Sequence, residues 1–132
     1  MKGLAAKIIK SLTIGSRLLC SDNSGAKEIE IIGVLGHKGT RKRSFKAGIC
    51  DIVIAAVKKG KPEMVKKVVR ALIIRQRKEY KRANGMVIYF EDNAAVLLNE
   101  DNMPLGTEIK GVVAREVAER HPKVAAIASI KL

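Results

Sequence analysis

One stretch of the sequence, residues 48–97, decides the fold: GICDIVIAAVKKGKPEMVKKVVRALIIRQRKEYKRANGMVIYFEDNAAVL. It contains apolar runs at 52–57, 71–74 and 86–90 that are rich in Val and Ile. Runs of this length, separated by Gly, Asn and Pro, are typical of strands rather than helices. Most of the cations lie between the runs, so the stretch predicts a small, mainly β core whose basic loops face an anion.

The whole chain is strongly basic. Its 132 residues include 26 Lys and Arg against 13 Asp and Glu, which gives a formal net charge of +13. Such an excess repels itself in a free monomer and favours a polyanionic partner. Nucleic acid is the expected partner and a membrane is not, because the sequence has no long amphipathic basic helix and no lipidation motif.

Length and hydropathy predict one cytoplasmic domain over residues 1–132. A hydrophobic content of 47% argues against disorder, and the length suits a single core. No stretch approaches transmembrane length, and the N-terminus lacks the apolar core of a signal peptide. Residues 1–11 read as a basic tail that orders on binding.

Scarce aromatic residues restrict the kind of nucleic acid that is expected. Trp is absent and the aromatic content is 3%, which disfavours a single-strand binder built on stacked bases. Recognition of folded RNA by backbone and shape fits better. Cys20 and Cys50 are isolated from each other and from both histidines, so we expect buried free thiols and no metal site.

The remaining elements follow from local patterns. Strands are expected at Arg17–Cys20, at Glu28–Leu35 with a bulge or bend at Gly33, and at Val68–Gln76. The near-continuous apolar run at 52–57 predicts a buried strand, with Ile54 and, in the next strand, Ile73 as core residues. We also expect one helical turn at Pro62–Lys67, a strand at Ile109–Val113, and short helices at Ala114–Glu119 and Pro122–Ala128.

The segment RQRKEYKR at 75–82 has no apolar face, whichever way a strand would present it. It therefore predicts a two-stranded ribbon that projects from the barrel and turns at Asn84-Gly85. Tyr80 is expected to lie on ribose or phosphate rather than in a core. The loop at 37–46 carries five cations and no acid, and it is also expected to contact RNA.

The residues predicted to bind RNA come from these basic segments. They are Lys38, Arg41, Lys42, Arg43, Lys46, Lys58, Lys59, Lys61, Lys66, Lys67, Arg75, Arg77, Lys78, Tyr80, Lys81 and Arg82. The sequence shows no phosphate loop, nucleophile elbow or metal-binding helix motif, so no catalytic residue, metal or cofactor is predicted.

Several fixed spacings resemble the ribosomal protein uL14 (L14) family of the large ribosomal subunit. The central signature is ALII at 71–74, Asn84-Gly85, Phe90, Asn93 and Val96-Leu97. Further matches are DNSGA at 22–26, DIV at 51–53, Gly106-Thr107, Gly111 and ARE at 114–116. KKGKPE at 58–63 and IRQRK at 74–78 are similar to the archaeal and eukaryotic branch. Two positions depart from the pattern, Cys50 where Gly is usual and Val112 where Pro is usual.

The resemblance implies a closed five-stranded β-barrel with a projecting ribbon and two short C-terminal helices. It also implies binding to large-subunit (23S-type) rRNA, intersubunit bridges to small-subunit rRNA, and the neighbours uL3 and eL24. A subunit anti-association factor is expected at the C-terminal region, whose charges are more balanced. The protein-binding residues predicted there are Arg115, Glu116, Glu119, Arg120 and Lys123.

Two alternatives remain open from the sequence. A stripe of Val117, His121 and Val124 either closes one end of the barrel or faces a partner. The chain could also be a free-standing OB-like RNA-binding protein, such as an RNA chaperone or a translation factor, although surface aromatics for that role are scarce. An enzyme is a further functional possibility, but the sequence shows no catalytic site.

Overall fold

The structure is a computed structural model that describes residues 6–35 and 46–132. Four predicted RNA-binding residues, Lys38, Arg41, Lys42 and Arg43, lie outside the described residues. In the described part of the chain, no helix is long and apolar enough to cross a bilayer.

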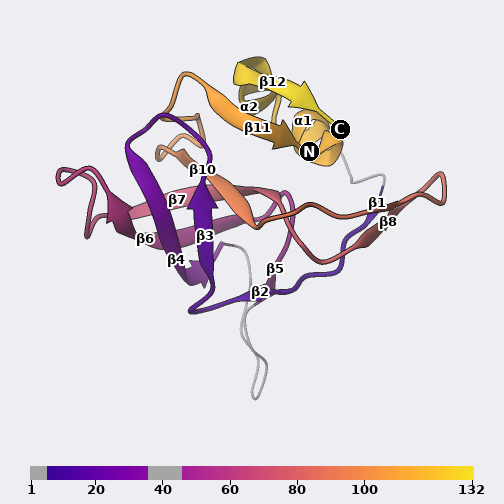
Figure 1. The fold of residues 1–132 in the computed structure, drawn as a ribbon, viewed down its shortest axis with the longest axis horizontal. Helices are drawn as coiled ribbons and strands as arrows, with labels where there is room; N and C mark the ends of the chain where they lie inside the picture. The colour runs from indigo at the N-terminus through magenta and orange to yellow at the C-terminus, as the bar shows by residue number, and fades with distance from the viewer. Residues whose placement is uncertain (1–5, 36–45) are drawn as a thin grey trace.

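A closed barrel forms the centre of the molecule, as predicted (Figure 1). Its strands lie in the order β10-β3-β4-β6-β7, and the β3–β10 pairing is parallel while the other pairings are antiparallel. Their bounds are β3 Arg17–Cys20, β4 Ala26–Val34, β6 Ile52–Gly60, β7 Val68–Arg75 and β10 Ala94–Leu98.

Strand β6 shows how closure of the barrel determines which side chains are buried. Val53, Ala55 and Val57 point inward and are at most 1% exposed, whereas Ile54 is half-buried on the outer surface. The prediction that Ile54 is a core residue is therefore wrong, because alternate side chains of a strand face opposite sides. Ile73 on β7 is fully buried, as predicted.

Two irregularities shape the barrel wall. The β4–β6 register shifts between Ile31 and Gly33, which confirms the irregularity expected at that glycine. Strand β6 also continues to Gly60. Lys58 and Lys59 therefore lie on a strand, whereas a loop was expected to begin at Lys58. After β6, the N–H groups of Met64 and Val65 donate to the carbonyl of Lys61, which gives the single turn expected there.

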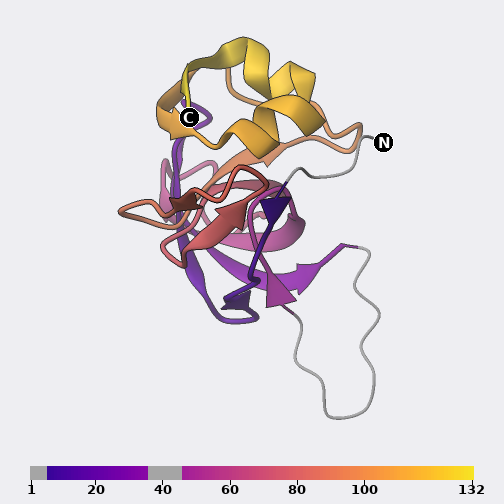
Figure 2. The ribbon, with the colours of Figure 1, turned by 90° about the vertical axis from the view of Figure 1, so that its right-hand side faces the viewer.

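A C-terminal layer covers one side of the barrel (Figures 1 and 2). It consists of β11 Ile109–Val113, α1 Arg115–Arg120, α2 Pro122–Ile127 and β12 Ala128–Lys131, with β11 and β12 paired in parallel. The two predicted helices are confirmed, and β12 is an unexpected addition. Val117 and Val124 are buried in the common core, so the predicted stripe closes the barrel.

The ribbon projects from the barrel, at the right of Figure 1. It consists of β8 Tyr80–Arg82 and β9 Val87–Ile88, and β1 Ala6–Lys7 pairs with β8 on the other side. Two further short strands, β2 Leu12–Thr13 and β5 Lys46–Ala47, pair with each other. The part of the chain that precedes the barrel is therefore paired through two short strands, β1 with β8 and β2 with β5.

One face at the base of the ribbon is core, so the prediction that neither face of 75–82 is buried is wrong. Gln76 is 0% exposed and Tyr80 is 1% exposed. The Gln76 side-chain amide donates to the carbonyl of Ile9 and its oxygen accepts from the N–H of Ile49, at 3.1 and 3.0 Å. These bonds satisfy a polar side chain that the segment before β2 covers.

Candidate nucleic-acid interface

Five exposed lysines gather at the turn between β6 and β7, and we call them the hairpin cluster. Two lie at the end of β6 and three in the turn; they are Lys58, Lys59, Lys61, Lys66 and Lys67. The two strand lysines reach Glu30 and Glu28 on β4, with Nζ–Oε distances of 3.2 and 3.7 Å. Exposed ion pairs of this kind are weak, because water and salt screen them. A phosphate can therefore replace either carboxylate.

A second set of exposed cations lies on the ribbon: Arg77, Lys78 and Lys81. Nε of Arg77 donates to the carbonyl of Glu91 at 2.8 Å, which holds the guanidinium in place. Nζ of Lys78 lies 3.2 Å from the carboxylate of Glu79, which is itself exposed. Lys46 on β5 is also exposed. These four cations are available to a polyanion.

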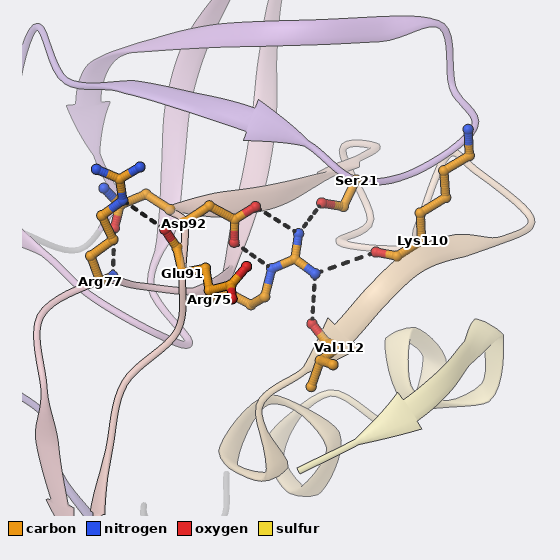
Figure 3. Close-up of polar contacts among 8 residues, drawn as sticks. Ser21, Arg75, Arg77, Glu91, Asp92, Lys110 and Val112 are labelled. Carbon is orange, nitrogen blue, oxygen red and sulfur yellow. Dashed lines mark hydrogen bonds and ion pairs between the residues drawn. The ribbon is translucent and has the colours of Figure 1, made fainter.

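Arg75 is placed differently from its prediction as an RNA contact (Figure 3). Nη1 donates to the carbonyl of Val112 at 3.1 Å, and Nη2 donates to Oγ of Ser21 at 2.7 Å. Nε lies 2.9 Å from a carboxylate oxygen of Asp92, and the side chain is 11% exposed. Arg75 therefore joins the barrel to the C-terminal layer, and a Cβ at Gly111 would collide with its guanidinium.

Tyr80, Arg82 and Glu116 form one buried polar cluster between the ribbon and α1. The Tyr80 hydroxyl donates to Oε2 of Glu116 at 2.8 Å, and Nε of Arg82 donates to Oε1 at 2.6 Å. Nη2 of Arg82 also donates to the carbonyl of Leu132. The Arg82 and Glu116 side chains are 10% and 4% exposed. Burial and the bond to Glu116 raise the pKa of Tyr80, so its hydroxyl stays protonated.

The cluster places three predicted contact residues inside the fold. Tyr80 and Arg82 were predicted to touch RNA, and Glu116 was predicted to touch a protein partner. All three side chains instead satisfy one another inside the fold, as buried charges must. On the remaining C-terminal surface, Arg115, Glu119 and Lys123 are exposed while Arg120 is half-buried.

The two cysteines are free, and burial raises the pKa of each thiol to about 12. Sγ of Cys20 donates to Asp22 at 3.0 Å. Cys50 has a φ of 74°, a left-handed conformation that suits glycine, and it stands where the family resemblance expects glycine. Among the described residues, no three His, Cys, Asp or Glu side chains gather closely enough to hold a metal ion.

Sequence reasoning missed one cation, Arg17, because it is isolated in its strand. The structure brings it to a cavity of about 270 Å³ between β3 and the segment that precedes β10. The cavity is lined by Arg17, Leu18, Leu19, Glu28, Arg77, Asp92 and Asn93. Nη1 of Arg17 donates to Glu28 at 3.0 Å, and this bond lowers the pKa of the carboxyl.

Comparison with known proteins identifies the family of the chain that carries these features. The model of the family described as ribosomal protein L14p/L23e matches residues 11–132. The chain belongs to this family. It is 51% identical to the large ribosomal subunit protein uL14 of Methanocorpusculum labreanum and 53% identical to that of Methanococcus vannielii, in each case over 98% of both chains.

Membership of the L14p/L23e family makes this chain a structural protein of the large subunit of the cytoplasmic ribosome, and not an enzyme. The closed barrel and the two C-terminal helices are those that the resemblance implied. The exposed cations are therefore those of a ribosomal protein.

Proposed function

We propose that this L14p/L23e family member binds large-subunit rRNA and contributes to intersubunit bridges with small-subunit rRNA. The observation that carries the proposal is the hairpin cluster, five exposed lysines at the end of β6 and in the turn after it. Among the described residues, their ion-pair partners are the half-buried carboxylates of Glu28 and Glu30. Lysines act as point charges toward phosphates, so such a cluster fits the RNA backbone more than a base edge.

The ribbon cations extend this interface. Arg77, Lys78 and Lys81 lie on a projection that the barrel and the segment before β2 support from one side. A rigid projection carries its charges to RNA without first being ordered, which reduces the entropy lost on binding. Lys46 adds a further charge on β5.

The C-terminal layer is proposed to face proteins. Its exposed charges are of both signs, as at Arg115, Glu119 and Lys123, and a carboxylate beside rRNA phosphates would be repelled. The proposed partners are the neighbouring proteins uL3 and eL24 and a subunit anti-association factor. Glu116 and the half-buried Arg120 are not part of the proposed contact surface.

Sedimentation tests the proposal. The five lysines of the hairpin cluster are changed to Gln, and the variant is expressed beside the wild-type chain. We expect wild type to sediment with the large subunit through moderate salt and the variant to appear mainly near the top of the gradient. A control that removes two charges changes exposed cations on the C-terminal layer, Lys110 and Lys131, to Gln and should remain bound.

A different outcome would favour the free-standing RNA-binding barrel. In that case wild type itself would leave the particle as salt is raised, since a chaperone or factor is held mainly by screened charges. Retention of the five-lysine variant on the particle would instead show that the cluster does not carry RNA binding.

A further inference from the structure

The cavity between β3 and the segment before β10 has the features of a nucleotide site. The β3–β10 pairing covers two positions, Ala94 with Leu19 and Ala95 with Cys20. Beyond this short pairing the two segments leave the cavity of about 270 Å³. It is lined by residues of β3 and β4, by Arg77 at the base of the ribbon, and by Asp92 and Asn93 before β10.

Asn93 fixes the geometry of this cavity. Its carbonyl accepts from the N–H of Leu19 at 3.1 Å, and its side-chain oxygen accepts from the N–H of Arg77 at 2.9 Å. Asn93 therefore holds the base of the ribbon against β3. As a result, Arg17 and Arg77 line the same cavity although they are 60 residues apart in the sequence.

Both guanidinium groups have N–H donors that form no hydrogen bond within the described part of the chain. The side-chain bond of Arg77 involves Nε, and that of Arg17 involves Nη1 with Glu28. Nη1 and Nη2 of Arg77 and Nη2 of Arg17 have no hydrogen-bond partner among the described residues. Planar guanidinium groups bind phosphate through paired N–H donors and also stack on nucleobases.

The charge around the cavity favours an anion. Glu28 is shared by Arg17 and Lys59, at 3.0 and 3.7 Å, while Asp92 is neutralised by Arg75. Arg77 makes no ion pair with any described carboxylate. The two cations and two carboxylates of the lining balance, and the positive excess at the site comes from Lys59 and Arg75, which pair with those carboxylates from outside the lining. Through Glu28 and Lys59 it is also continuous with the hairpin cluster.

The wall of the cavity is apolar at one point. Leu19 is 51% exposed on β3, and it shares the outer side of that strand with Arg17 because the two residues are two positions apart. A phosphate alone would gain nothing from a leucine side chain. A ribose or a base would cover it and remove apolar surface from water.

We infer that this cavity binds one nucleotide of an unpaired segment of rRNA. Its phosphate lies between Arg17 and Arg77, and its ribose or base covers Leu19. The inference rests on the proposed function, since it names one contact within the same RNA interface. It differs from the hairpin cluster in kind, because it recognises an unstacked nucleotide and not only backbone charge.

The test uses the full chain and a large-subunit rRNA transcript from an archaeal template, with filter binding from about 50 to 200 mM salt. We expect Arg17→Gln with Arg77→Gln to weaken binding by about tenfold to a hundredfold. The control Lys110→Gln with Lys131→Gln removes the same charge and should change affinity by about threefold or less. Arg77→Gln alone, which leaves the Arg17–Glu28 pair intact, should show part of the loss.

A second readout locates the nucleotide. The transcript carries 4-thiouridine, and crosslinked peptides are identified after irradiation. We expect crosslinks in the peptides that contain Leu19 and Asn93, and their disappearance in the double arginine variant. Equal affinities of the arginine variant and the control, or an absence of these crosslinks in wild type, would overturn the nucleotide site. Absence of salt-dependent binding by wild type would overturn the proposed function instead.

Discussion

Replacing Glu116 by Gln probes the buried cluster that joins the ribbon to α1. The change keeps the shape of the side chain and removes its charge. Arg82 would then retain a guanidinium that is 10% exposed with no carboxylate beside it. Tyr80 would keep an acceptor, because the amide oxygen of Gln can still receive its hydroxyl proton.

The magnitude follows from the burial and from the bonds that are lost. Glu116 accepts two hydrogen bonds from Arg82, at 2.6 and 3.2 Å, in a site where its own side chain is 4% exposed. Breaking a buried ion pair by removing one partner costs about 3–5 kcal/mol. Small domains have a total stability of about 5–15 kcal/mol, so the variant should lose a large share of its stability.

The assay is urea unfolding followed by circular dichroism, with Glu119→Gln as the matched control. Glu119 lies on the same helix and is exposed, so its variant should stay within about 0.5 kcal/mol of wild type. A second variant, Glu116→Leu with Arg82→Met and Tyr80→Phe, removes both charges and the buried hydroxyl that would lose its acceptor. It should be more stable than Glu116→Gln by about 1 kcal/mol or more. Equal stability of Glu116→Gln and Glu119→Gln would refute the reasoning.

Two further predictions concern the core and the thiols. Ile73→Ala should lower the free energy of unfolding by about 2–5 kcal/mol, and Ile54→Ala by about half of that or less, because the first side chain is fully buried and the second half-exposed; equal losses in thermal unfolding would contradict the assigned facing of the strands. The thiols of Cys20 and Cys50, each with a pKa raised to about 12 by burial, should react slowly with a thiol reagent at about pH 8. Since both pKa values are raised above the ordinary thiol value of 9.0, the folded state holds more protons between these values, and stability should fall as pH rises from about 9 toward 12 in a pH-dependent melting series.

Local patterns predicted the elements of this fold well. The strands β3, β4, β7 and β11, the turn at Asn84-Gly85 and both C-terminal helices follow from apolar periodicity and turn-forming residues. The sequence did not predict which side of β6 faces the core. Its run IVIAAV is apolar at every position, so nothing in the sequence distinguishes Ile54 from Val53. Pairing with β4 and β7 in a closed barrel makes that choice.

At the candidate site, too, the sequence predicts some features and not others. The lysines of the hairpin cluster were predicted because they lie close together in the sequence, within residues 58–67, where a turn was expected. Arg82 and Arg75 carry the same charge, but Glu116 and Ser21, which accept from them, lie 34 and 54 residues away in the sequence. Arg17 was not predicted because it is isolated in its strand and its neighbour in the cavity, Arg77, lies 60 residues away between β7 and β8.

The sequence by itself therefore determined the strongly basic charge, the mainly β character and the membership of the L14p/L23e family. Only the tertiary structure decided which cations are free to meet RNA and which are held inside the protein. The physical reason is that charge belongs to a residue, whereas its availability depends on burial and on the acceptors that distant segments bring to it.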